Sequence, residues 1–134
     1  MSGENAEVIR GAVEAWNAAD MDRLRTFYDP DIVVRPLPDW PEATPEITRG
    51  RDELMRMFAQ IREPWDATDV LEVLGDFVTA GDRVIARYRW KAEGHGPPMS
   101  MELTYVNVVR NGRIVEIEMF WDHDKALEAV GLSE

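Results

Sequence analysis

The sequence contains no cysteine and only two histidines. The absence of cysteine excludes disulfide bonds, thiolate zinc sites and cysteine nucleophiles. His95 and His123 lie in different connections between predicted elements and share no metal-ligand spacing, so we predict no metal site. The sequence also contains neither a phosphate-binding glycine loop nor a serine–histidine–acid motif, which leaves no sign of a bound cofactor.

Basic residues are few relative to acidic ones. The chain has 15 lysines and arginines against 26 aspartates and glutamates, a formal net charge of −11. Such a surface repels nucleic acid and anionic membranes, because binding to either requires clustered basic charge. No apolar run approaches the roughly 18 residues of a membrane span, and the opening residues MSGENAEV lack the pattern of a signal peptide. We therefore expect a cytoplasmic protein with no nucleic-acid or membrane partner.

The residues that are abundant fit one compact domain. Of the 134 residues, 45 % are hydrophobic and 31 % are charged, proportions typical of a globular protein. Folding should bury roughly two-thirds of the surface of a chain this long, which is enough for a core and an internal pocket. Since no repeat or low-complexity tract divides the chain, we predict a single domain over residues 1–134.

The first half of the chain has the spacing of helices. Apolar residues recur three and four positions apart over 4–19, which predicts a helix. Asp20 is a candidate N-cap for a second, short helix, and a short β-branched strand follows at 32–34. The next connection, 36–49, contains four prolines and Trp40. A connection this long in a small domain is typical of a functional loop, here a candidate lid.

A third helix is predicted between Gly50 and Pro64, and the hydrophobic period then changes from helical to alternating. The alternation predicts four strands over 68–79, 83–93, 99–110 and 113–121. Short turns between consecutive strands favour an antiparallel meander. A last helix over 125–130 ends at Gly131. Helices followed by an antiparallel sheet predict the α+β class.

Three phrases carry a family resemblance: AWNAADMDRLRTFYDPDIVV, AGDRVIARYRW and NGRIVEIEMFWDHDKALEAVGL. In this order they resemble the SnoaL-like group of the nuclear transport factor 2-like superfamily. The resemblance implies a cone-shaped α+β barrel, with N-terminal helices packed in the concave side of a curved antiparallel sheet. It also implies an internal ligand cavity and a homodimer formed through the outer sheet face. Isomerases, cyclases, hydrolases, dehydratases and non-catalytic binding proteins share this cone, so the fold alone does not give the function.

The register of the last hairpin follows from the two strands that flank Asn111-Gly112. A two-residue turn would pair Tyr105 with Glu118, whereas a three-residue loop that includes Arg110 pairs Tyr105 with Ile117 and Leu103 with Met119. Paired residues share a face of the sheet, so we predict the second register, which keeps apolar residues together. The outer face then carries Glu102, Thr104, Glu116 and Glu118, with Arg87 and Arg89 as cross-strand partners.

Side chains on the opposite, inner face predict the wall of a cavity. Aromatic rings, methionines and a few polar groups suit a flat, mainly apolar small molecule. The same residue types also fill ordinary cores, and both interpretations remain open. The predicted pocket residues are Trp16, Trp40, Phe58, Tyr88, Trp90, Met101, Leu103, Tyr105, Asn107, Met119 and Trp121.

The resemblance can be tested against the functional residues of related enzymes. Ketosteroid isomerases use a carboxylate base, a tyrosine and a protonated aspartic acid. In this chain the position of the base falls on or beside Pro36, that of the tyrosine on Ala12, and that of the aspartic acid near Tyr105. SnoaL-type cyclases and limonene-type epoxide hydrolases carry an inward aspartate on the last strand, where this chain has Met119. A thioether cannot transfer the proton that those reactions need.

Two other groups of residues are candidates for catalysis. Tyr105 and Asn107 lie two positions apart on one strand and project together, about 7 Å from each other. They could polarise a carbonyl or pair within a core. Asp122 and His123 are candidate proton carriers, although an aspartate before the last helix is also a natural N-cap.

Two functions are compatible with these residues. One is a protein that binds a hydrophobic carbonyl metabolite in an internal apolar cavity, with cofactor-free isomerisation, cyclisation, dehydration or hydrolysis as the candidate reactions if it is catalytic. In that case a carboxylate from the 36–49 loop, Asp39 or Glu42, is a candidate for the missing base. The alternative is a non-catalytic binding or dimerisation module that uses the outer sheet face.

Overall fold

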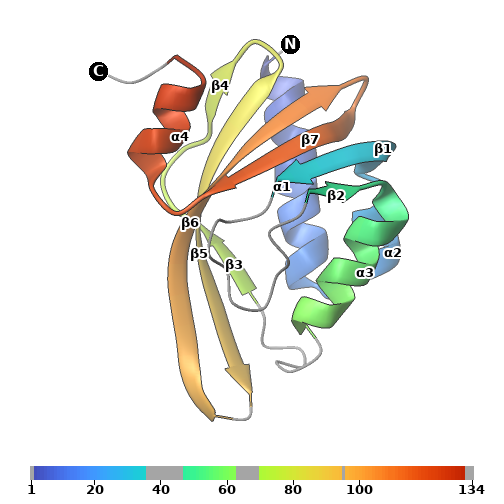
Figure 1. The fold of residues 1–134 in the computed structure, drawn as a ribbon, viewed down its shortest axis with the longest axis vertical. Helices are drawn as coiled ribbons and strands as arrows, with labels where there is room; N and C mark the ends of the chain where they lie inside the picture. Colours follow the sequence, from blue (N-terminus) through green and yellow to red (C-terminus); the bar gives the residue numbers. More distant parts are fainter. Residues whose placement is uncertain (1, 36–46, 63–69, 95, 132–134) are drawn as a thin grey trace.

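The computed structural model of the protein describes residues 2–35, 47–62, 70–94 and 96–131. Of the described helices, two precede the first strand, a third lies between the second and third strands, and a fourth follows the last strand (Figure 1). The helices are α1 (Ser2–Asn17), α2 (Met21–Arg25), α3 (Arg51–Arg62) and α4 (His123–Ala129). The strands are β1 (Tyr28–Arg35), β2 (Thr48–Arg49), β3 (Val70–Val73), β4 (Val78–Ala80), β5 (Arg83–Gly94), β6 (Gly96–Arg110) and β7 (Arg113–Phe120).

The seven strands form one curved sheet in the order β2-β1-β7-β6-β5-β3, and β4 also pairs with β5. The antiparallel meander from β3 to β7 and the α+β class are confirmed. The sheet is mixed rather than purely antiparallel, because β1 lies parallel to β7. The predicted strand 68–79 is two strands, β3 and β4, separated by a bend at Gly75, whose φ is +72°. The predicted connection after residue 93 is nearly absent, since Gly94 pairs with Gly96.

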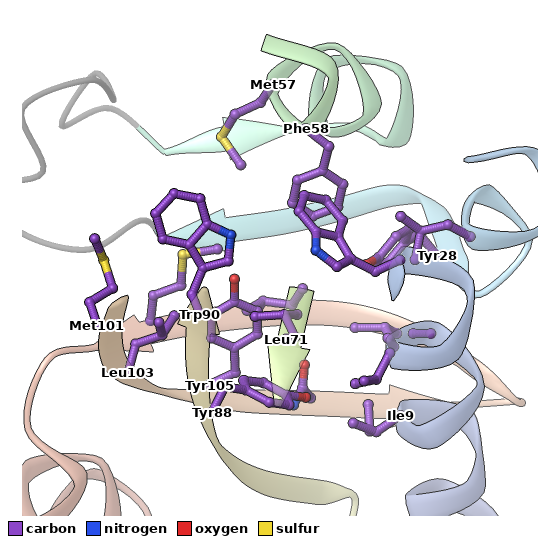
Figure 2. A pocket seen from close by; sticks show the side chains of 18 residues that line it. Ile9, Tyr28, Met57, Phe58, Leu71, Tyr88, Trp90, Met101, Leu103 and Tyr105 are labelled. Atoms are coloured by element: carbon purple, nitrogen blue, oxygen red, sulfur yellow. The ribbon is translucent and has the colours of Figure 1, made fainter. Parts of the chain in front are cut away.

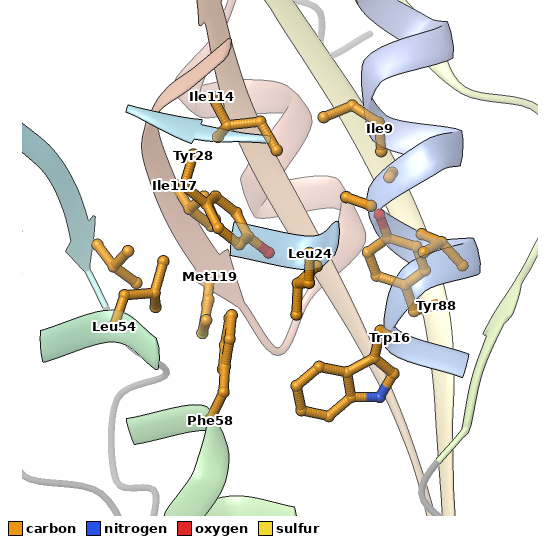
Figure 3. Packing of buried hydrophobic residues seen from close by; sticks show 14 of the residues in the cluster. Ile9, Trp16, Leu24, Tyr28, Leu54, Phe58, Tyr88, Ile114, Ile117 and Met119 are labelled. Atoms are coloured by element: carbon orange, nitrogen blue, oxygen red, sulfur yellow. The ribbon is translucent and has the colours of Figure 1, made fainter. Parts of the chain in front are cut away.

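The N-terminal helices lie on the inner face of the sheet because each has one apolar side. The buried side of α1 carries Ile9, Val13 and Trp16, which repeat at the spacing of a single helical face. Asp20 caps α2 as predicted: its carboxylate accepts a hydrogen bond of 3.1 Å from the Arg23 N–H. The third helix buries Leu54, which is 0 % exposed and belongs to the main core, part of which Figure 3 shows.

The alternation of β5 separates the two faces of the sheet as predicted. Tyr88 and Trp90 are buried on the inner face. Arg87 and Arg89 lie on the outer face, where Arg87 donates a 2.8 Å hydrogen bond to Glu102. Further ion pairs on this face join β5 to Glu72 on β3. The nitrogen–oxygen distance to Glu72 is 3.1 Å from Arg89 and 3.0 Å from Lys91. These ion pairs are half-exposed, so each contributes little to stability.

The register of the β6–β7 hairpin differs from the prediction. Arg110 pairs with Arg113 across a two-residue Asn111-Gly112 turn, and Tyr105 pairs with Met119 instead of Ile117. A β-bulge follows, because β6 advances by one residue from Val109 to Val108 while β7 advances by two. The bulge adds one residue to the strand, whereas the predicted three-residue loop added one to the turn. Both arrangements therefore place Met119 on the inner face and Glu118 on the outer face.

The turn makes a prediction about Asn111. Asn111 and Gly112 both have positive φ, +54° and +75°, as a type I′ turn requires. We expect Asn111→Ala to lower the free energy of unfolding by about 1 kcal/mol, because alanine lacks the local polar compensation that lets asparagine adopt this conformation. Urea denaturation measures the change. Asn111→Gly is the control and should be nearly neutral; equal losses in both variants would contradict the explanation.

The C-terminal helix covers part of the outer face of the sheet. Ala126 is fully buried and packs with Ile85 and Val106 in a second, smaller core. Phe120 and Leu127 pack against it. This part of the outer face is therefore occupied by the chain itself, and the homodimer through that face stays a prediction. Among the described helices, none combines the length and apolar character needed to cross a membrane.

Candidate functional site

A mainly apolar cavity of about 100 Å³ lies between α1, α3 and the inner face of the sheet (Figure 2). Side chains from helices and strands surround it together. They are Ile9, Ala12, Val13, Trp16, Leu24, Tyr28, Met57, Phe58, Leu71, Tyr88, Trp90, Met101, Leu103, Tyr105, Asn107, Ile114, Ile117 and Met119.

The structure brings most of the predicted pocket residues together around this cavity. The shared members are Trp16, Phe58, Tyr88, Trp90, Met101, Leu103, Tyr105, Asn107 and Met119. Trp40 lies outside the described residues.

Trp121 differs from its predicted position. We extended the last strand to residue 121, but β7 ends at Phe120. The strand alternation therefore no longer directs the indole inward, and Trp121 is 41 % exposed. It lines a shallow polar depression on the surface beside Asp122 and Arg87.

Some lining residues were missed by the sequence analysis, and Tyr28 is the most informative. It is 5 % exposed and is the first residue of β1, where it pairs with Ile114 near the start of β7. Tyr28, Ile32 and Val34 are the buried positions of this strand and are separated by even numbers of residues. The period-two signal was present, but Pro30 interrupts it and suggested that the strand began later.

Aromatic rings fix much of the cavity wall. Trp16 on α1 meets Phe58 on α3 edge to face, with ring centroids 5.0 Å apart. Tyr28 packs against the same phenyl ring at 5.9 Å. Tyr88 and Tyr105, from adjacent strands, form a second edge-to-face pair at 5.2 Å and 82°. Such pairs hold rings in defined orientations, so the cavity has a wall with little freedom to rearrange.

Three tyrosines from three strands give the cavity its polar character. Burial raises the pKa of the Tyr28 hydroxyl well above its usual value, and the neighbouring Tyr105 raises it further. Burial likewise raises the pKa of Tyr88, with smaller contributions from Tyr105 and Tyr28. All three tyrosines line the same cavity, and the rings of Tyr88 and Tyr105 are in contact. Tyr28 and Tyr88 are therefore protonated at neutral pH and keep an O–H group that can donate a hydrogen bond.

Asn107 lies beside this cluster but is partly committed to the sheet. It is 2 % exposed, and its Nδ2 donates a 3.1 Å hydrogen bond to the carbonyl oxygen of Val84 on β5. This bond fixes the orientation of the carboxamide within the wall. Tyr105, two residues away, also lines the cavity and is less deeply buried. The predicted pair is thus present, with Asn107 as its more rigid member.

The structure does not bring Asp122 and His123 to the cavity. The Asp122 carboxylate caps α4, accepting a 2.9 Å hydrogen bond from the Asp124 N–H. His123 Nδ1 lies 3.1 Å from the hydroxyl of Thr104, on the face of β6 opposite to Tyr105. Neither residue lines the cavity, and the sheet separates them from it, so their predicted role as proton carriers has no support from this cavity. The N-cap alternative for Asp122 is confirmed.

The described residues contain no group of three or more histidine, aspartate or glutamate side chains placed to hold a metal ion.

Comparison with known proteins gives a family and a set of related structures. Residues 9–117 match the model of the SnoaL-like domain. IdmH from Streptomyces antibioticus, described as a candidate polyketide cyclase, is 26 % identical with a TM-score of 0.72, over 86 % of this chain and 89 % of IdmH. Bal32a, from a soil-derived mobile gene cassette, is 24 % identical with a TM-score of 0.79, over 88 % of each chain.

A candidate polyketide cyclase from Sinorhizobium meliloti is 24 % identical with a TM-score of 0.65, over 84 % of this chain and 93 % of that protein. No protein with a curated description matches the sequence. The family match spans most of the chain, and the related structures share its helices and curved sheet. The chain belongs to the SnoaL-like domain family.

Proposed function

We propose that the protein binds a flat, apolar, carbonyl-bearing small molecule of the polyketide type in the cavity between α1, α3 and the sheet. The observation that carries the proposal is the composition of the cavity wall, in which three tyrosines and Asn107 lie among apolar and aromatic side chains. A pocket of this composition buries apolar surface and fixes it with a few hydrogen bonds. At about 100 Å³ the cavity encloses only part of the ligand, and the rest extends past the partly exposed lining residues.

The ligand is neutral where it meets the described wall. None of the described lining residues is an aspartate, glutamate, histidine, lysine or arginine, and burying an unpaired ionic group there would be costly. A ligand carbonyl can instead accept a hydrogen bond from a phenol. We assign this contact to Tyr105, because it lines the cavity and is the least buried of the three tyrosines.

This contact supports a cyclase-type reaction by polarisation of the carbonyl. A hydrogen bond from Tyr105 stabilises negative charge that develops on the ligand oxygen when an adjacent carbon reacts. The similarity to IdmH, a candidate polyketide cyclase, supports the same class of substrate. We assign ligand binding and carbonyl polarisation to the described residues. We do not assign to them the removal of a proton from the ligand.

Fluorenone and fluorene are suitable probes, because these flat tricyclic molecules differ by one carbonyl group. A thermal-shift titration with fluorenone should raise the melting temperature of the wild-type protein; at a hundred times the dissociation constant, stabilisation reaches about 2.7 kcal/mol. Fluorene should bind more weakly. The absence of any shift with either probe would contradict the proposed cavity ligand.

The variant Tyr105→Phe tests the hydroxyl directly. It keeps the ring and its contact with Tyr88, so the melting temperature of the free protein should change little. We expect its affinity for fluorenone to fall about fivefold, the value of one neutral hydrogen bond. Its affinity for fluorene should stay the same. Equal losses for both probes would show that the substitution disturbs the shape of the cavity instead of removing a hydrogen bond.

A further inference from the structure

One side chain joins the end of α1 to the edge strand β3. The Nδ2 of Asn17 donates a 2.9 Å hydrogen bond to the Leu71 carbonyl oxygen, and its Oδ1 accepts a 2.8 Å hydrogen bond from the Leu71 N–H. A single carboxamide thus satisfies both backbone groups of one residue, 54 positions away in the chain. The two elements lie side by side in Figure 1.

The position of Leu71 in the ladder explains why these groups are available. Leu74 donates to the carbonyl of Arg87 on β5. In an antiparallel ladder the backbone groups of alternate residues point to opposite sides, so Leu71, three positions earlier, directs its N–H and carbonyl away from β5. That side is the open edge of the sheet, because β3 is the last strand in the order. Asn17 occupies this edge in place of a further strand.

Leu71 also belongs to the cavity, at its more exposed end. Most lining residues are buried, but Met57, Leu71, Met101 and Tyr105 are partly exposed. We define these four as the mouth of the cavity. Figure 2 shows Leu71 on β3 between Trp90 and the α1 side of the cavity. The residue before Asn17, Trp16, lines that same side.

We propose that the Asn17 carboxamide is a specificity-determining clamp that holds Leu71 against α1 and thereby fixes the β3 side of the cavity mouth. The inference rests on the proposed binding of a small molecule in this cavity. β3 has only four residues and a partner strand on one side, so few other backbone bonds hold Leu71. The two bonds from Asn17 hold it against α1, which limits the size of the ligand that can pass.

The test compares the association rates of a wide probe and a narrow probe. Fluorenone has three fused rings and 1-indanone has two, and both carry a carbonyl. Stopped-flow quenching of tryptophan fluorescence measures each rate constant. In Asn17→Ala we expect the association rate constant for fluorenone to rise about fivefold, since the two hydrogen bonds that hold Leu71 in place at the mouth are lost. The rate constant for 1-indanone should rise less than about twofold, because the narrower probe is less restricted by the mouth.

Two further variants make the comparison specific. Asn17→Asp keeps an acceptor for the Leu71 N–H but loses the donor to the Leu71 carbonyl, so it should shift the rates in the same direction. It also serves if Asn17→Ala does not fold. Gln60→Ala removes an exposed carboxamide from α3 and should change neither rate. Hydrogen exchange at the Leu71 amide should become about fivefold faster in Asn17→Ala, which shows that the clamp has been released.

The outcomes separate this inference from the proposed function. If wild-type protein binds neither probe, both are overturned. If the wild type binds and the ratio of the two association rates is unchanged in both Asn17 variants, only the clamp is overturned. A merely structural role of Asn17 would lower the melting temperature without changing that ratio, and this result also contradicts the clamp.

Discussion

Replacement of Ala12 by phenylalanine should abolish ligand binding while the protein remains folded. Ala12 is 7 % exposed and lines the cavity from α1. A phenyl ring at this position extends into the space that a ligand would occupy. We expect the affinity for fluorenone to fall at least about a hundredfold, because the pocket no longer has room to bury a tricyclic molecule. Isothermal titration measures the loss.

The same substitution at an exposed position provides the control. Ala18 follows α1 and is exposed, so Ala18→Phe should leave fluorenone binding unchanged. Circular dichroism should show the wild-type helix and strand content in Ala12→Phe, whose free energy of unfolding should change by less than about 2 kcal/mol because the ring enters existing space. A folded Ala12→Phe protein with normal affinity would place the ligand outside this cavity.

Truncation of Leu54 should have the largest effect on stability. Its side chain is 0 % exposed and belongs to the main core that α3 forms with the sheet (Figure 3). Leu54→Ala removes buried methyl groups and leaves a void, so the free energy of unfolding should fall by about 3 kcal/mol. For a chain of this size that loss lowers the melting temperature by about 10 °C.

A substitution at the neighbouring residue, Glu53, distinguishes the effect of lost core packing from the effect of a change in the helix itself. Glu53 precedes Leu54 on α3, and its side chain is exposed and paired with Arg56. Glu53→Ala should have a much smaller effect than Leu54→Ala in urea denaturation, since an exposed ion pair contributes little. Leu54 does not line the cavity, so fluorenone should bind the folded fraction of Leu54→Ala with normal affinity. Equal destabilisation by the two variants would contradict this account.

Local patterns were sufficient to predict most of the secondary structure and the inward-facing residues. The side chain of Asp20 caps α2 because its residue type suits that position. Tyr88 faces inward because strand residues alternate and its neighbours Arg87 and Arg89 form ion pairs outside. The wrong hairpin register still gave the correct face for Met119, since a bulge in β7 and a longer turn both add one residue.

Features that depend on distant contacts could not be predicted in the same way. The parallel pairing of β1 with β7 joins segments about 80 residues apart, and no local pattern encodes it. At the bulge in β7 two apolar residues, Ile114 and Val115, are adjacent in the sequence, and their types do not show which of them faces inward. At the site, Trp121 was misplaced because the strand ends one residue earlier than its apolar pattern. Asn17 was missed because an exposed asparagine near a helix end is ordinary without its partner Leu71.

The position of α4 on the outer face affects how the protein is made. This helix follows β7 in the chain, so the ribosome synthesises it after every strand of the sheet. Until α4 docks, Ile85 and Val106 leave an apolar patch uncovered on the outer face of β5 and β6. Such a patch on a nascent chain attracts chaperones and other unfinished chains. Docking of α4 therefore removes from solvent an apolar patch that would otherwise favour aggregation at this face.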